Sequence, residues 1–145
     1  PLYTAYTAGK DLVPVPRAET RATAIKIGNP VSWRKSLRAV QASEGVVTEV
    51  DEQAIFDAKA QVDAAGIGAE PASCATVAGV KRLVAEGVIP ADARVAGVLT
   101  GHLLKDPDAV VGYHKGELTD LDAKFANAPV QTAATLDAVM KVLDE

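Results

Sequence analysis

The chain has 145 residues, of which 48% are hydrophobic and 4% aromatic, with a formal net charge of -4. This length suits one domain, and a mildly acidic chain with scattered basic residues argues against nucleic-acid binding. A single cysteine, Cys74, excludes an internal disulfide and argues against a metal cluster. No apolar run reaches the roughly 18 residues that a membrane span needs. Together these features lead us to expect a cytoplasmic protein.

The start of the chain predicts little regular structure. Residues 1–16 show no sustained periodicity, and the Val13-Pro-Val-Pro16 run favours extended backbone, because residues before proline avoid helical angles. We expect a surface loop or hairpin there. Residues 17–27 predict a short helix or turn that ends at Gly28-Asn29-Pro30.

The next segments predict a helix, a strand and a second helix. Ser32 is the candidate N-cap of a helix that stops at Gly45. Apolar residues recur there at helical spacing, namely Trp33, Leu37 and Val40. The alternating pattern over 45–50 indicates a strand, and Asp51 is a plausible N-cap for a helix over 52–65.

The second half of the chain continues this alternation. Glu70-Pro71 predicts the start of a helix that closes at Gly87, since proline is favoured at the first helical position. Its expected inward residues are Val77, Val80, Leu83 and Val84. The apolar run 94–99 is typical of a strand buried on both faces of a parallel sheet. Residues 135–145 predict a terminal helix, and the whole order indicates an α/β fold with a doubly wound parallel sheet.

One candidate site follows the predicted strand 94–99. Thr100 places a hydroxyl at the carboxyl end of that strand, where ligands bind in open α/β sheets. Gly101 beside it would let a ligand approach the backbone closely. The simpler interpretation is that Thr100 only ends the strand, and both interpretations remain open on these residues alone.

Three segments carry a resemblance to a known family. Leu99-Thr-Gly-His-Leu-Leu-Lys-Asp-Pro107 is similar to a segment of the threonine synthases, which are fold-type II pyridoxal-phosphate enzymes. Ala22-Thr-Ala-Ile-Lys-Ile-Gly-Asn-Pro30 and Glu70-Pro-Ala-Ser73 agree as well, in the right order. The resemblance covers about residues 17–108, and Leu103 departs from it, because the family has glycine there.

The resemblance implies a fold and an extent. It implies the tryptophan synthase β-like architecture, of which residues 1–145 would be a single C-terminal fragment of the larger cofactor-binding domain. Residues 113–145 would be a C-terminal extension that ends in a helix. The expected partner is therefore the N-terminal portion of the same enzyme, and whole family members are commonly homo-oligomers.

The resemblance also implies cofactor-binding residues. Thr100 would hydrogen-bond the pyridine nitrogen of pyridoxal phosphate, and Ala24 and Ile25 would line the face of the cofactor. Glu70 would be an acid near the ring, although the helix dipole favours a glutamate at a helix N-terminus in any case. No catalytic residue, substrate-binding residue or metal ligand is assigned within the chain.

The implied activity is the conversion of O-phosphohomoserine and water to threonine and phosphate. The Schiff-base lysine motif and the glycine-rich phosphate loop of the family are absent from the sequence, so we expect the chain alone to be inactive. Two alternatives stay open. One is a threonine or serine dehydratase of the same fold, which shares the Glu-Pro-Ala pattern. The other is a non-catalytic module that binds a partner chain.

Overall fold

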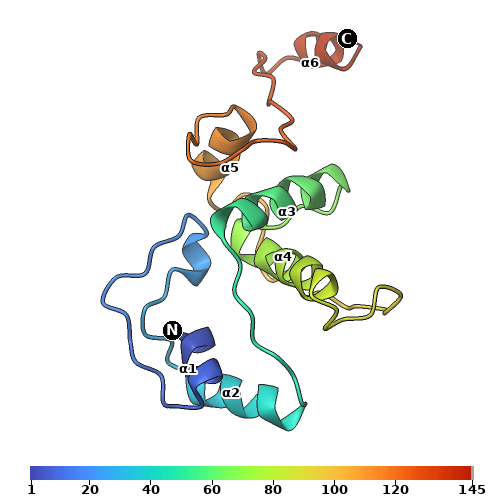
Figure 1. The fold of residues 1–145 in the computed structure, drawn as a ribbon. Coiled ribbons are helices and arrows are strands. Elements are labelled where there is room, and N and C mark those ends of the chain that lie inside the picture. Colours follow the sequence, from blue (N-terminus) through green and yellow to red (C-terminus); the bar gives the residue numbers. More distant parts are fainter. Residues whose placement is uncertain (145) are drawn as a thin grey trace.

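The computed structural model describes residues 1–144, which form six α-helices and one short 3-10 helix. These elements are α1 (Leu2–Ala8), η1 (Thr23–Ile25), α2 (Trp33–Ala42), α3 (Glu52–Ala64), α4 (Pro71–Ala85), α5 (Pro107–His114) and α6 (Leu136–Leu143). Figure 1 shows α3 and α4 paired at the centre, with α1 and α2 on one side of them and α5 and α6 on the other. None of the described helices is long and apolar enough to cross a membrane.

The α3–α4 pair is the core of the molecule. Asp51 caps α3, because its carboxylate accepts a hydrogen bond of 2.8 Å from the amide of Ala54, as predicted. Pro71 opens α4 at a position where its missing amide proton costs nothing, also as predicted. Buried apolar residues from both helices and the segment between them form one cluster: Ala58, Val62, Ala69, Cys74 and Ala78.

The predicted inward face of α4 is only partly right, because Val77 packs against the buried cluster but the most deeply buried positions are others. The buried residues of this helix are small ones near its start and middle, namely Pro71, Ser73, Cys74, Ala78 and Gly79. The four larger residues expected inside, Val77, Val80, Leu83 and Val84, are only half buried. Periodicity counts every apolar residue alike, whereas a helix that packs closely on its neighbour selects small side chains for the contact.

The first half of the predicted loop 1–16 is helical as α1, which corrects that prediction, whereas residues 9–16 are irregular as predicted. Helix α1 ends at Gly9, whose φ of +61° lets the chain turn into an αL cap with hydrogen bonds back to the helix. Seven residues with one buried position, Ala5, are too few for a periodic signal in the sequence. Helix α2 begins after Ser32 as predicted, although the Ser32 side chain makes no capping hydrogen bond.

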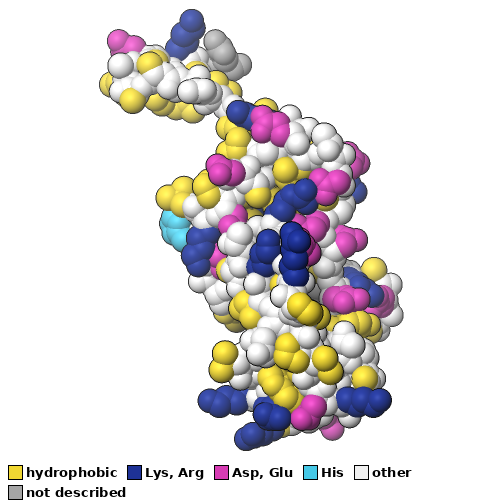
Figure 2. Space-filling view, turned by 90° about the vertical axis from the view of Figure 1, so that its left-hand side faces the viewer, with side chains coloured by type: hydrophobic (Ala, Val, Ile, Leu, Met, Phe, Trp, Pro, Cys, Tyr) yellow, Lys and Arg dark blue, Asp and Glu magenta, His cyan; other side chains and the backbone are white. Residues whose placement is uncertain are grey.

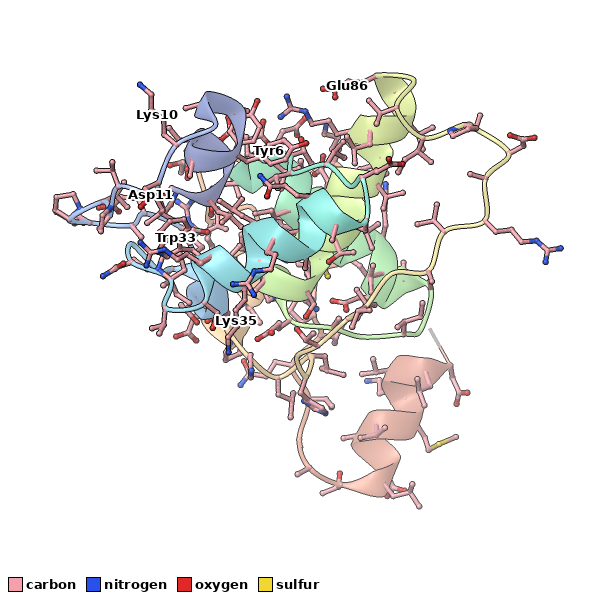
Figure 3. All side chains as sticks on the ribbon, turned by 90° about the horizontal axis from the view of Figure 1, so that it is seen from below. Tyr6, Lys10, Asp11, Trp33, Lys35 and Glu86 are labelled. Carbon is pink, nitrogen blue, oxygen red and sulfur yellow. The ribbon has the colours of Figure 1, made fainter. Side chains whose placement is uncertain are left out.

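Helices α1 and α2 enclose a hollow of about 380 Å³. Figure 3 labels four of its lining residues, Tyr6, Lys10, Asp11 and Trp33, at the junction of the two helices. The Tyr6 hydroxyl donates to the carbonyl oxygen of Gly45 over 3.2 Å and ties α1 to the segment after α2.

The two predicted strands are not formed among residues 1–144. Segments 45–50 and 94–99 carry no strand or helix, although Val50 and Leu99 pack against the buried cluster of α3 and α4. Val98 in the second segment is 72% exposed, whereas we expected burial on both faces. A strand exists only through hydrogen bonds to a neighbouring strand, and among the described residues neither segment has such a neighbour.

The last two helices differ in how they attach. Helix α5 was not predicted, although Asp106-Pro107 is a start signal, and its Tyr113 is buried and stacked on Phe56 at a centroid distance of 6.0 Å. Helix α6 agrees with the prediction for residues 135–144, with Thr135 as its N-cap, while Glu145 lies outside the described residues. Figures 1 and 3 show α6 apart from the other helices, and Figure 2 shows hydrophobic side chains exposed along it.

Candidate functional site

The candidate site lies where segment 94–99 meets the start of α4. The hydroxyl oxygen of Ser73 accepts hydrogen bonds from the amides of Thr100, over 3.0 Å, and Gly101, over 2.9 Å. The amide of Glu70 in turn donates to the carbonyl oxygen of Gly101 over 3.1 Å. These contacts hold Thr100 and Glu70, two of the predicted site residues, at one junction.

Glu70 is buried beneath this junction. Its residue surface is only 3% exposed, and its Oε2 forms an ion pair with Nζ of Lys105 at 3.1 Å. Oε2 therefore has a counter-charge but no recorded hydrogen-bond donor among the described residues. Oε1 accepts from the Ser73 hydroxyl over 3.4 Å. The Lys105 charge offsets part of the cost of burying this carboxylate.

Gly101 is required by sterics at this junction. A Cβ atom added to Gly101 would lie 1.9 Å from the Glu70 carboxylate carbon, far inside van der Waals contact. The absence of a side chain therefore lets the backbone of Gly101 cover the glutamate. Thr100 beside it is exposed, with its hydroxyl oxygen 3.2 Å from that of Ser73.

The loop after Gly101 is held by local contacts. The ring Nδ1 of His102 accepts a hydrogen bond from the amide of Leu104 over 3.2 Å, which fixes the turn. The Leu103 side chain packs against Gly68, where an added Cβ would lie 2.8 Å from Leu103 Cδ2. The residue that departs from the threonine synthase pattern thus fills space over a glycine of the α3–α4 connection.

Ala24 and Ile25, the other predicted site residues, lie on η1. Both are exposed, and η1 packs against α4. The amide and hydroxyl of Thr23 donate to the Asp106 carboxylate over 3.0 and 2.6 Å. This contact joins the segment 22–30 to the segment that carries Thr100, so all three segments of the resemblance lie close together in the fold.

Sequence reasoning gave no role to Ser73 or Asp106. Ser73 is the third residue of α4. The sequence feature that points to it is a hydroxyl near the start of a helix, and the N-cap residue of that helix, Glu70, makes no side-chain capping hydrogen bond. Asp106 has a φ of +53°, unusual for a residue other than glycine. Its signal is the Asp-Pro pair that begins α5, which sequence reasoning left unused.

The comparison with known proteins decides the family. Residues 1–101 match the pyridoxal-phosphate dependent enzymes. The chain belongs to this family. It is 36% identical over 137 residues to the threonine synthase of Methanocaldococcus jannaschii, covering 94% of this chain and 31% of that protein. It is 48% identical over 103 residues to the threonine synthase of Methanosarcina acetivorans, covering 69% and 25%.

A plant relative agrees with these two. Threonine synthase 2, chloroplastic, of Arabidopsis thaliana is 35% identical over 147 residues, which cover 100% of this chain and 28% of the relative. The chain therefore spans less than a third of the length of these relatives, and the match lies in their C-terminal region.

The junction suits the cofactor of this family. Pyridoxal phosphate presents a flat heteroaromatic ring with one nitrogen, which needs a polar partner and backbone that permits close approach. Thr100 offers an exposed hydroxyl to that nitrogen, and the missing side chain of Gly101 lets the backbone beside Thr100 lie directly on the buried Glu70 carboxylate. The residues present therefore fit one edge of the cofactor.

Cys74, close to this junction along α4, is not a reactive group. Burial, in the first place, raises the pKa of the Cys74 thiol to about 11, and the thiol is fully enclosed in the α3–α4 core. A thiol is nucleophilic as the thiolate, so this cysteine is inert near neutral pH.

Proposed function

We propose that this chain is the C-terminal part of a threonine synthase, whose complete polypeptide converts O-phosphohomoserine and water to threonine and phosphate. The observation that carries the proposal is the meeting of the three motif segments around Ser73, Gly101 and Asp106. The names of the matched relatives support the same activity. The substrate, the cytoplasmic location and a homo-oligomeric assembly belong to this proposal.

In this proposal each residue of the junction has a defined task. Pyridoxal phosphate supplies the electron-withdrawing ring that lets phosphate leave the γ carbon of the substrate and water add at the β carbon. With the cofactor bound, the Thr100 hydroxyl would donate a hydrogen bond to the pyridine nitrogen. Gly101 has no side chain, so its backbone lies directly on the paired Glu70, which supports the Thr100–Gly101 segment from beneath.

The same proposal assigns the cofactor face to η1. Ala24 and Ile25 present exposed atoms and backbone along one element, and the Thr23–Asp106 contact holds that element against the loop after Thr100. Residues 1–145 are then one fragment of the cofactor-binding domain, with 113–145 as its C-terminal extension. A chain that spans less than a third of its relatives supports this division.

The doubly wound parallel sheet is also part of the proposal. Segments 45–50 and 94–99 become strands when the remaining polypeptide supplies their neighbours. Backbone amide exchange tests this expectation, because pairing protects amides that are otherwise open to water. The expected result is slow exchange in both segments within the complete polypeptide and fast exchange in the isolated chain. Equal exchange in the two samples would remove the sheet from the proposal.

Product analysis tests the activity. The complete polypeptide, supplied with pyridoxal phosphate and O-phosphohomoserine, should release phosphate and threonine in equal amounts. A dehydratase would instead form 2-oxo acids from threonine or serine. A non-catalytic module would form neither product.

Two variants at Thr100 test the site. A carboxylate beside the pyridine nitrogen favours its protonated form, so Thr100→Asp should shift the cofactor spectrum and lower threonine formation. Thr100→Ala should have a smaller effect and weaken cofactor binding by about 1 kcal/mol, since it removes one neutral hydrogen bond. A Thr100→Asp protein with the parent's spectrum and rate would exclude Thr100 from the ring nitrogen.

A further inference from the structure

Four polar groups surround the hydroxyl oxygen of Ser73. The amides of Thr100 and Gly101 donate to it over 3.0 and 2.9 Å. The hydroxyl oxygen of Thr100 lies at 3.2 Å, and Oε1 of Glu70 at 3.4 Å. Ser73 is only 3% exposed, so its hydrogen bonds are made inside the protein.

The hydrogen-bond capacity of Ser73 fixes where the neighbouring protons go. A hydroxyl has one proton to donate and two lone pairs to accept with, and the two amides fill both lone pairs of Ser73. Thr100 therefore cannot donate its proton to Ser73. The Ser73 proton goes to Thr100 or to the Glu70 carboxylate, since both oxygens accept.

The Thr100 proton is consequently left for another group. Among the described residues, Ser73 is the one hydrogen-bonding neighbour of the Thr100 hydroxyl. A ring laid over Thr100 would close it off from water, and an enclosed hydroxyl proton without an acceptor carries a desolvation cost. A protonated ring nitrogen cannot accept a hydrogen bond, so it would leave the Thr100 hydroxyl proton enclosed and without an acceptor.

We propose that Ser73 is a positioning residue that directs the Thr100 hydroxyl to donate a hydrogen bond to an unprotonated heteroaromatic nitrogen. The inference rests on the proposed function, in which this nitrogen belongs to pyridoxal phosphate. Ser73 does not touch the ring. It acts by occupying its own acceptor positions with the amides of Thr100 and Gly101, so that Thr100 is a donor on its exposed side.

The test reads the protonation of the ring nitrogen directly. The complete polypeptide is loaded with pyridoxal phosphate labelled with ¹⁵N in the ring, and the nitrogen chemical shift is followed as the pH is lowered. The variants are Ser73→Ala, Ser73→Thr and, as the matched control on the same helix, Cys74→Ala. Amide exchange at Thr100 and Gly101 reports whether their acceptor has been removed.

The parent, Ser73→Thr and Cys74→Ala should keep an unprotonated nitrogen over the whole range. In Ser73→Ala the Thr100 hydroxyl is free to rotate and to accept, so the nitrogen should take up a proton with an apparent pKa at least about one unit higher. A purely structural role for Ser73 would lower stability and speed amide exchange but leave the nitrogen shift unchanged.

Three results would overturn the inference. One is a protonated ring nitrogen in the parent. Another is a Ser73→Ala protein whose ring nitrogen keeps the parent's chemical shift at every pH although the amides of Thr100 and Gly101 exchange fast. If Ser73→Ala does not fold, Ser73→Thr decides, because a protonated nitrogen in that hydroxyl-bearing variant contradicts the proposed role. Thr100→Val separates the two proposals: an unchanged nitrogen signal there removes Thr100 from the ring, and the proposed site fails with it.

Discussion

The hydroxyl of Tyr113 donates a hydrogen bond to Oδ1 of Asp57 over 2.8 Å, and both residues are buried. This contact joins α5 to α3, and α5 follows directly after the loop that carries Thr100. The bond therefore fixes one end of the candidate site to the core.

Tyr113→Phe should lower the free energy of unfolding by about 1–2 kcal/mol, because a buried carboxylate loses one of its donors. Asp57 keeps a hydrogen bond from Gln53 and an ion pair with Lys124, which limits the loss. Urea unfolding measures the difference. Tyr3→Phe is the matched control, since the Tyr3 hydroxyl makes no hydrogen bond within residues 1–144, and it should change stability by less than about 0.5 kcal/mol.

The same contact predicts a dependence on pH. Burial, followed by the hydrogen bond to Asp57, raises the pKa of Tyr113 from 10.0 to about 12. The folded chain holds this proton where the unfolded chain loses it, so the contribution is complete below pH 10 and disappears as the pH rises towards 12. The stability gap between the parent and Tyr113→Phe should therefore narrow over this interval. A gap that stays constant up to pH 12 would contradict the raised pKa.

Two glycines on either side of Thr100 provide a steric test of the site. Gly101→Ala should cost about 1–3 kcal/mol of stability and weaken cofactor binding in the complete polypeptide, because its Cβ collides with the Glu70 carboxylate. Gly97→Ala should be nearly neutral, since its Cβ would meet Thr76 Cγ2 at an ordinary 3.7 Å. Equal losses in the two variants would show that the Glu70–Gly101 contact is not as tight as the structure has it.

Cys74 should resist thiol reagents in the folded chain. A pKa near 11 in place of 9.0 lowers the thiolate fraction roughly 100-fold near neutral pH, and enclosure in the core blocks access as well. Labelling with a chromogenic disulfide reagent measures this. The expected result is slow labelling of the native chain and rapid labelling in denaturant, and rapid labelling in both would place the thiol at the surface.

The isolated chain should not attach pyridoxal phosphate covalently. The family's Schiff-base lysine motif is absent from the sequence, and Lys105, the lysine nearest the junction, is held by the Glu70 carboxylate. Borohydride reduction followed by mass spectrometry of the chain checks this. A stable adduct on Lys105 would reassign that residue, whereas an adduct confined to the remaining polypeptide agrees with the proposed division.

Local signals in the sequence predicted the central helices well. Asp51 and Pro71 mark the starts of α3 and α4, because a cap and a first-turn proline act through neighbouring backbone atoms. The strands over 45–50 and 94–99 depend on partners elsewhere, so no signal within those segments can form them. Helix α1 was missed because it has a single buried residue, Ala5, to mark its inner face.

The site was only partly predictable for the same reason. Thr100 and Glu70 were identified through their motifs, and the structure brings them to one junction. Ser73 gained no role from the sequence, because its importance arises from two amides 27 and 28 residues away. A hydroxyl near a helix start is a local signal, but it does not show which distant amides the hydroxyl accepts from.

The separation of contacting residues along the chain also has a kinetic consequence. Helices α3 and α4 are joined by a short connection, whereas the Thr23–Asp106 contact closes a loop of 83 residues. Loop closure costs entropy that grows with loop length, and contacts between remote residues form slowly. We expect the helical hairpin to assemble first and the Thr23–Asp106 clasp to close last. During folding, the α3–α4 core would then be packed before the Thr23–Asp106 contact completes the candidate binding site.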